Sequence, residues 1–202
     1  MKLMDINEEK TRIRKEIRRR RESIPSKILS DIEESLPDFI SAIEDEELRT
    51  RLGKAERIAL YRAFKGEVPV DGLAKSFMKR GIRCCFPRIE NGNMSFYDCE
   101  SLSDDKFETS SFGIKEPFGN GSKADPKSID VVVLPAVAYN EEGTRLGMGG
   151  GYYDRFIGSF ESERPYLLGI CYEFQICSDV PVTAQDLNVD FIAVIPEEVY
   201  GE

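Results

Sequence analysis

Histidine is absent from the 202 residues of this chain. Its absence excludes Ser-His-Asp and Cys-His nucleophilic catalysis, histidine acid–base catalysis and nearly all catalytic zinc sites. The chemistry left open uses carboxylates, lysine, arginine, tyrosine, backbone amides and hard metal ions held by oxygen. Phosphoryl transfer suits these groups, because its catalysis consists mainly of positioning and charge neutralisation.

Long apolar runs and paired cysteines are also missing. No run approaches the roughly 18–20 apolar residues needed to cross a bilayer, and residues 1–9 carry charge where the apolar part of a signal peptide would lie. The five cysteines form no CxxC pair, and in a chain without an export signal they are expected to be reduced and to serve in packing. These features predict a cytoplasmic protein with no membrane partner.

Charge is unevenly distributed along the chain. The whole chain carries a net charge of −9, whereas residues 10–21 contain eight Lys or Arg residues and a single acidic one. Residues 7–24 predict a helix, and because Ile13, Ile17 and Ile24 recur at helical spacing, one face of it should lie on the body of the protein. A basic helix on an acidic body favours an anionic small-molecule ligand at one end and argues against general nucleic-acid binding.

The rest of the chain alternates between helical and strand-like patterns. Residues 129–135 form a continuous β-branched run, which is typical of the middle of a parallel sheet. The order of elements predicts an α/β fold, with a mostly parallel sheet between helices on both faces, as a single domain over residues 1–202. Further helices are predicted at residues 26–43, 70–80 and 152–160, with a short charged helix or loop at 44–53. Strands are predicted at residues 57–64, 82–86, 94–99, 129–135, 166–171 and 191–195.

Proline and glycine predict where several of these elements are interrupted. Pro37 should break or kink the second helix, and Pro87 should end the second strand. Asn91-Gly92 should turn a hairpin between two strands. Residues 100–127 are rich in Ser, Asp, Gly, Lys and Pro and predict a long loop, which in a small domain is usually functional or mobile.

The segment Gly143–Arg155 carries the most specific pattern. It follows the strongest predicted strand, opens a helix, and has glycine at positions 147, 149, 150 and 151. Such glycines let the backbone approach a ligand with its amide N–H groups directed at phosphate oxygens. The segment is neither a Walker A loop, since no Gly-Lys-Ser/Thr follows, nor GxGxxG, since Tyr152 stands at the last glycine position. The residues favour a phosphate-binding loop over a tight turn without ligand, and Asp154 suits a first helical turn in either case.

The decapeptide Arg145-Leu-Gly-x-Gly-x-Gly-Tyr-Tyr-Asp154 resembles the signature of the 5-formyltetrahydrofolate cyclo-ligases, also called methenyltetrahydrofolate synthetases. The resemblance extends over essentially the whole chain, because weaker family segments follow one another in the family's order. These segments are Lys10-x-x-x-Arg14, Tyr61 to Glu67, Phe86-Pro-Arg88, Phe112-Gly-Ile-x-Glu-Pro117, and Val180-Pro-Val182 with Asp186 and Asp190.

The resemblance implies a fold and a reaction. The fold would be the three-layer arrangement also found in sugar-phosphate isomerases and CoA transferases. The reaction would convert 5-formyltetrahydrofolate and ATP, with Mg²⁺, to 5,10-methenyltetrahydrofolate, ADP and phosphate. The formyl oxygen would attack the γ-phosphoryl group, and N10 would then close on the activated carbon. No protein nucleophile is needed, which agrees with a chain lacking histidine.

The resemblance also implies roles for individual residues. Arg145 and Lys10 would be catalytic, and Arg145→Ala is expected to lower turnover with little loss of stability. Glu67, Arg62 and Tyr152 would bind the folate, and Asp154 and Asp190 would hold Mg²⁺. ATP would contact Lys10, Arg14, Arg145, Leu146, Gly147, Met148, Gly149, Gly150, Gly151, Tyr152 and Tyr153.

Departures from the family pattern and other functions stay open at this stage. Ala136, Asn140 and Gln185 replace residues that are common at these positions in the family. One alternative is another enzyme with a phosphate-bearing ligand, such as a sugar-phosphate isomerase. The other is a nucleic-acid-binding protein that uses the basic helix, whose Lys10 and Arg14 would then form a solvated face. The favoured reading is a monomer that binds a folate, with the basic residues able to attract a polyglutamate tail.

Overall fold

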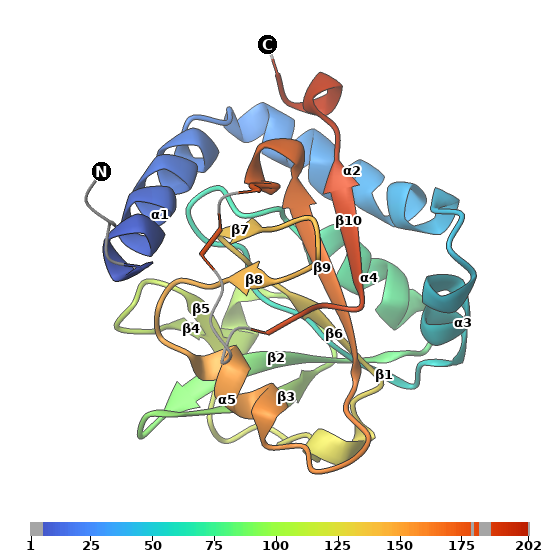
Figure 1. Ribbon diagram of the computed structural model, residues 1–202. Helices are drawn as coiled ribbons and strands as arrows, with labels where there is room; N and C mark the ends of the chain where they lie inside the picture. The colour runs from blue at the N-terminus through green and yellow to red at the C-terminus, as the bar shows by residue number, and fades with distance from the viewer. Residues whose placement is uncertain (1–5, 179, 182–186, 202) are drawn as a thin grey trace, which may run out of the picture.

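The computed structural model describes residues 6–178, 180–181 and 187–201. Its centre is a six-stranded sheet with strand order β10-β9-β6-β1-β2-β3 (Figure 1). The first five strands are parallel to their neighbours, and β3 is antiparallel to β2. The strands are β1 (Arg57–Ala59), β2 (Arg83–Glu90), β3 (Asn93–Cys99), β6 (Val131–Leu134), β9 (Tyr166–Tyr172) and β10 (Phe191–Ile195).

The central strand is β6, as its β-branched run predicts. It pairs with β1 on one side and β9 on the other, and all four of its residues are buried. Its side chains alternate between the two faces, so that Val131 and Val133 join one apolar cluster while Val132 and Leu134 join another. A strand buried on both faces requires a covering layer on each side.

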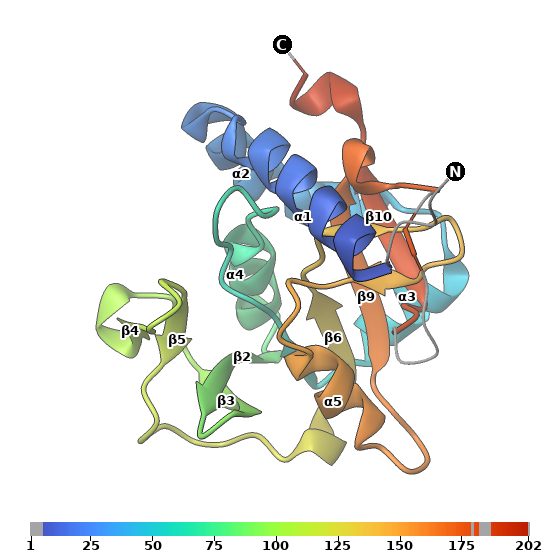
Figure 2. The same cartoon turned by 60° about the vertical axis from the view of Figure 1, so that its left-hand side comes forward.

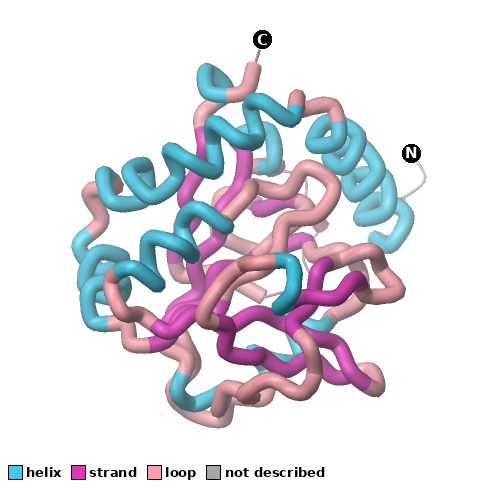
Figure 3. Tube along the Cα trace, turned by 180° about the vertical axis from the view of Figure 1, so that it is seen from behind, coloured by secondary structure: helices cyan, strands magenta, loops and turns pink. Residues whose placement is uncertain are grey.

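Helices supply both covering layers. On one face, α2 (Ser26–Ala42), α3 (Glu46–Lys54) and α4 (Asp71–Lys79) pack apolar stripes against the sheet. Figure 3 shows this helical layer from behind. On the other face, Phe156 and Ile157 of α5 (Tyr152–Gly158) pack against β6 and β1. The helix α1 (Ile6–Glu22) lies beside the small hairpin of β7 (Ala138–Tyr139) and β8 (Arg145–Leu146) (Figure 2). Ile13 and Ile17 of α1 pack against Ala138 and Leu146 of this hairpin. The fold is therefore the expected three-layer α/β arrangement.

Neither proline ends its element. The helix α2 is not broken at Pro37 but continues to Ala42. Pro37 has no N–H to bond the Glu33 carbonyl, and this carbonyl lies against Gly72 of α4. The strand β2 runs through Pro87 to Glu90, because β1 pairs with β2 only as far as Cys85. Beyond that point one edge of β2 is open, and a proline there breaks no ladder on that side.

The segment 100–127 is not a structureless loop. It contains an antiparallel hairpin of β4 (Phe107–Thr109) and β5 (Lys115–Pro117), which packs beside β2. Gly113 turns this hairpin with φ +81°, a left-handed conformation that favours glycine. The predicted strand at 57–64 is also shorter and ends at Ala59. Short 3₁₀ turns complete the fold at Asp104–Lys106, Pro126–Ser128, Glu173–Gln175 and Glu197–Val199.

Across the described ranges, no helix has both the length and the apolar character that crossing a membrane would demand. The five cysteines are all free thiols, and three of them are buried.

Candidate active site

The glycine-rich loop lies between β8 and α5 and has the backbone conformation that its composition predicts. Gly149 has φ +105° and Gly151 has φ +64°, both in the region where a Cβ atom is disfavoured. Residues 148–150 are exposed, so that the backbone of the loop is open to a ligand.

Basic residues from α1 approach this loop. The Arg14 Nε atom donates to the Gly147 carbonyl at 2.9 Å, and a Cβ atom on Gly149 would lie 3.7 Å from the Arg14 guanidinium carbon. Lys10, one turn earlier on α1, is only 7% exposed. The structure therefore brings Arg14 together with the glycine loop, although the two segments are far apart in the sequence.

Arg145 lies beneath the same loop. Its guanidinium donates to the Pro135 carbonyl at 3.0 Å and to Asp154 Oδ1 at 2.9 Å, and it lies 5.4 Å from the centre of the Tyr153 ring. A Cβ atom on Gly147 would be 3.1 Å from both terminal nitrogens, a tight contact that favours glycine there. The Arg145 side chain is 4% exposed. From such burial we expect that removing Arg145 costs stability as well as turnover.

A cavity of about 340 Å³ opens next to the loop. Its walls come from the segment after β1, from β2 and β3, from the β4–β5 hairpin and from the glycine loop. The predicted folate residues Glu67, Arg62 and Tyr152 all line it, together with Arg145. Its apolar lining is formed mainly by Phe64, Pro87, Ile89, Met94, Phe112 and Ile114. A mostly apolar cavity with a few polar groups is the usual form of a small-molecule site.

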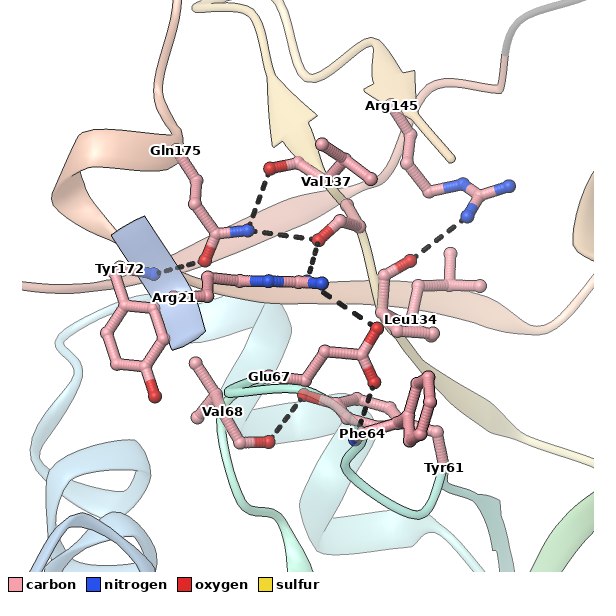
Figure 4. Close-up of polar contacts among 12 residues, drawn as sticks. Arg21, Tyr61, Phe64, Glu67, Val68, Leu134, Val137, Arg145, Tyr172 and Gln175 are labelled. Atoms are coloured by element: carbon pink, nitrogen blue, oxygen red, sulfur yellow. Dashed lines mark hydrogen bonds and ion pairs between the residues drawn. The ribbon is translucent and has the colours of Figure 1, made fainter. Parts of the chain in front are cut away.

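Glu67 is held by two donors (Figure 4). Its Oε2 accepts from the Phe64 amide at 3.1 Å, and its Oε1 lies 3.5 Å from the Nη1 of Arg21, which also donates to the Ala136 carbonyl. Burial raises the pKa of Glu67, and the Arg21 charge and the Phe64 amide offset part of that rise. Gly66 is required here, because a Cβ atom on it would lie 2.2 Å from the Arg21 carbonyl oxygen.

Arg21 is a site residue that the sequence analysis did not single out. Its side chain is 1% exposed, and its Nε and Nη2 atoms have no hydrogen-bond partner among the described residues. A sequence pattern could have predicted the burial of Arg21. The buried face of α1 is formed by residues that recur at helical spacing, namely Lys10, Ile13, Ile17 and Arg21. A cation on an apolar stripe indicates a buried partner.

The other predicted folate residues are also engaged within the protein. The Arg62 guanidinium pairs with Asp71 at 3.2 Å and lies 4.4 Å from the centre of the Phe107 ring, at the base of the hairpin. The Tyr152 ring lies under Arg155, with 4.9 Å between guanidinium carbon and ring centre. These contacts fix both side chains in the cavity wall.

The two predicted metal ligands have different surroundings. Asp154 is 30% exposed and bonded to Arg145 beside the loop. Asp190, at the start of β10, accepts from Arg164 through both oxygens and from the Leu167 amide at 2.7 Å. Within the described residues, no group of three or more His, Cys, Asp or Glu side chains is arranged to hold a metal ion.

Of the departures from the family pattern, Asn140 makes a contact through its side chain and Ala136 through its backbone. Asn140 Oδ1 accepts from the Thr144 amide and so holds the turn between β7 and β8. The Ala136 carbonyl accepts from both Arg21 and Gln175. Gln185, Asp186 and Val182 lie outside the described residues.

Comparison with known proteins identifies the family of the chain. The model of the 5-formyltetrahydrofolate cyclo-ligase family matches residues 6–195. A 5-formyltetrahydrofolate cyclo-ligase of Mus musculus is 24% identical over 94% of this chain and 95% of its own length, and one of Haemophilus influenzae is 27% identical over 93% and 98%.

Solved structures share the fold. The NMR structure of Aquifex aeolicus 5,10-methenyltetrahydrofolate synthetase superposes with a TM-score of 0.74 at 28% identity, covering 92% of this chain and 89% of the other. A 5,10-methenyltetrahydrofolate synthetase from Mycoplasma pneumoniae gives 0.69 at 24% identity, covering 91% and 97%. The chain therefore belongs to the 5-formyltetrahydrofolate cyclo-ligase family.

Proposed function

We propose that this protein catalyses the ATP- and Mg²⁺-dependent cyclisation of 5-formyltetrahydrofolate to 5,10-methenyltetrahydrofolate, with release of ADP and phosphate. The observation that carries the proposal is the continuity of the cavity with the glycine loop. Arg145 and the loop glycines form one wall, and Glu67 forms another. A folate in the cavity would thus present its formyl group to a phosphate bound at the loop.

The residues present fit the phosphates of ATP. The loop offers exposed backbone, Arg14 lies beside Gly149, and the buried Arg145 Nε has no partner among the described residues. In the proposed reaction the formyl oxygen attacks the γ-phosphorus and ADP leaves. N10 then bonds to the formyl carbon and loses its proton, and the carbon–oxygen bond breaks to release phosphate. Lys10, Arg14 and Arg145 would neutralise the charge of the transferred group.

Of the two aspartates predicted to bind Mg²⁺, only Asp154 has surroundings that suit the ion. Asp154 is partly exposed beside the loop and would hold Mg²⁺ together with phosphate oxygens, directly or through water. When bound, the ion would neutralise charge on the phosphates. Asp190 does not suit a magnesium ligand, because both oxygens of its carboxylate accept hydrogen bonds from Arg164.

The proposed function also implies a domain organisation, an oligomeric state and a cellular location. We propose one cyclo-ligase domain over residues 1–202, acting as a monomer in the cytoplasm on a folate that can carry a polyglutamate tail. Free cysteines support a reducing compartment. The burial of Lys10 and Arg21 argues against nucleic-acid binding through that face of α1.

The proposal is tested by absorbance near the methenyl-folate band. Purified protein is mixed with 5-formyltetrahydrofolate, ATP and Mg²⁺, and each component is withheld in turn. A rise in absorbance that needs all three supports the function. A folded, ATP-binding protein that gives no rise would contradict the folate half of the proposal, and sugar phosphates would then be the next substrates to test.

The conformation of the loop predicts the effect of a single methyl group. Gly149→Ala places a Cβ atom at φ +105°, which strains the loop by an amount on the order of 1–3 kcal/mol. Because the loop relieves this strain by leaving the conformation that binds phosphate, ATP should bind about 10-fold more weakly. Calorimetric titration of ATP measures the change. Gly158→Ala in α5 is the matched control, because its added Cβ meets no atom within 4 Å, and it should bind ATP normally. Equal ATP affinity in both variants would argue against this loop as the nucleotide site.

The two aspartates predict different responses to magnesium. Asp154→Asn should raise the Mg²⁺ concentration needed for half-maximal activity by about 10-fold or more. Asp190→Asn should leave that requirement unchanged and lower the melting temperature, because it weakens the bond to Arg164. Magnesium titrations of the two variants decide the assignment. An equal increase in both would mean that Asp190 leaves Arg164 to bind the metal.

A further inference from the structure

Glu116 on β5 is a buried carboxylate in the cavity that the reaction above does not use. The residue is 5% exposed and lines the cavity with Ile89 and Ile114. It belongs to the segment Phe112–Pro117, which so far has no role. A carboxylate is expensive to bury without partners, so its surroundings are informative.

The protein gives this carboxylate little hydrogen bonding. Its one hydrogen bond within the described residues comes from the Ile89 amide to Oε2 and is long, at 3.4 Å. The neighbouring Arg88 directs its guanidinium to Glu90, Glu108 and the Pro117 carbonyl instead. Ser110 Oγ is buried without a hydrogen-bond partner among the described residues.

The electrostatics agree with this geometry. Burial raises the pKa of Glu116, and the Ile89 amide and the Arg88 charge offset only part of the rise. The folded protein therefore holds a carboxylate where its charged form is disfavoured. A partner from outside the chain that donates hydrogen bonds would remove this penalty.

Glu67 and Glu116 occupy different ends of the cavity. Glu67 is tied through Arg21 to the Ala136 carbonyl, and Arg145 binds the adjacent Pro135 carbonyl, so Glu67 lies on the phosphate side. Glu116 belongs to β5 and accepts from the Ile89 amide of β2. Glu116 instead lies on the hairpin side.

We propose that Glu116 is a specificity-determining residue that binds the 2-amino and N3–H groups of the reduced pterin ring. These two adjacent donors match the two oxygens of one carboxylate. The apolar side chains around Glu116 would contact the faces of the ring, and Glu67 would be left near the formyl group and N10. The inference rests on the proposed function, because it takes the folate as the ligand.

The test measures folate affinity by calorimetry, without ATP. Glu116→Gln keeps the shape of the side chain but loses one acceptor and the charge, so the Kd for 5-formyltetrahydrofolate should rise about 10- to 100-fold. For an analogue with methyl in place of the 2-amino group, the variant should raise the Kd by less than it does for 5-formyltetrahydrofolate, since only the N3–H contact remains to be lost. The variant should melt no lower than the wild type, because a neutral amide is easier to bury than a charge.

Glu108→Gln is the matched control. Glu108 stands opposite Glu116 in the same hairpin, but it pairs with Arg88 and does not line the cavity. The Kd of the Glu108→Gln variant for 5-formyltetrahydrofolate should therefore change less than 2-fold. Wild-type affinity in Glu116→Gln overturns the inference. So does a wild type that binds the methyl analogue as tightly as 5-formyltetrahydrofolate, whatever the stability of the variant. A folded wild type that binds no 5-formyltetrahydrofolate overturns the proposed function itself.

Discussion

Replacing Arg145 by alanine is expected to lower kcat by about 10³-fold or more, by analogy with the loss of an arginine that neutralises a transferring phosphoryl group. The guanidinium is buried beneath the glycine loop and is fixed by the Pro135 carbonyl and Asp154. Such fixed charge needs no reorganisation during the reaction, which is why its removal should affect turnover strongly. Initial rates at saturating ATP and folate measure the effect.

The same variant should also lose stability. Removing Arg145 leaves Asp154 and the Pro135 carbonyl without their partner. Because Asp154 is 30% exposed, water can compensate in part, and the expected loss is about 2 kcal/mol. A protein of this size would then melt about 4–8 °C lower. Thermal denaturation followed by circular dichroism gives this value independently of turnover.

Arg164→Ala separates the two effects. Arg164 also forms an Arg–Asp pair, with Asp190, but it does not line the cavity. Its loss should lower the melting temperature and leave kcat within about 3-fold of wild type, because a part-exposed pair contributes only to stability. If Arg145→Ala kept kcat within 10-fold of wild type, Arg145 would have no catalytic role.

The sequence predicted best the features that repeat locally. Residues 129–135 carry a continuous β-branched run, which is typical of a strand that is buried on both faces. The structure accordingly has β6 at the centre of the sheet. The α1 stripe likewise predicted a helix packed on the body. The glycine loop was recognisable because its backbone conformation tolerates few other residues.

The remaining features depend on contacts between distant segments. The strands β4 and β5 have three residues each, too few to show a period, and their pairing gains support from packing beside β2. The partner of Asp190 is Arg164, and no local pattern links these positions. Pro87 looks like the end of a strand until the short length of β1 leaves an edge open beside it. The cavity likewise exists only once these segments meet.

The pairing of Arg21 with Glu67 carries the second large prediction. Arg21→Met removes the cation opposite a carboxylate that is 11% exposed, and breaking such a buried pair from one side costs about 3 kcal/mol. The melting temperature should fall by roughly 6–12 °C. Arg19→Met on the same helix is the matched control, because the Arg19 side chain is 77% exposed and its loss should change stability little.

The loss in Arg21→Met should depend on pH. Burial already raises the pKa of Glu67, and without the Arg21 charge it should rise further. A carboxyl whose folded pKa lies above its unfolded value near 4.5 favours the folded state below that value. This contribution is lost as the pH rises through the folded pKa. The melting temperatures of variant and wild type should therefore differ little near pH 4.5 and diverge toward pH 8. A difference that does not depend on pH would mean that Arg21 acts through packing and the Ala136 carbonyl alone.

The double variant Arg21→Met/Glu67→Gln tests the pair directly. With both charges gone, no uncompensated carboxylate remains, so most of the stability lost in Arg21→Met should return and the dependence on pH should disappear. Turnover should stay low, because Glu67 would still be missing from the phosphate side of the cavity. Recovery of stability would show that the loss in Arg21→Met comes from the uncompensated Glu67 carboxylate. If the two single effects simply add, Arg21 and Glu67 act independently.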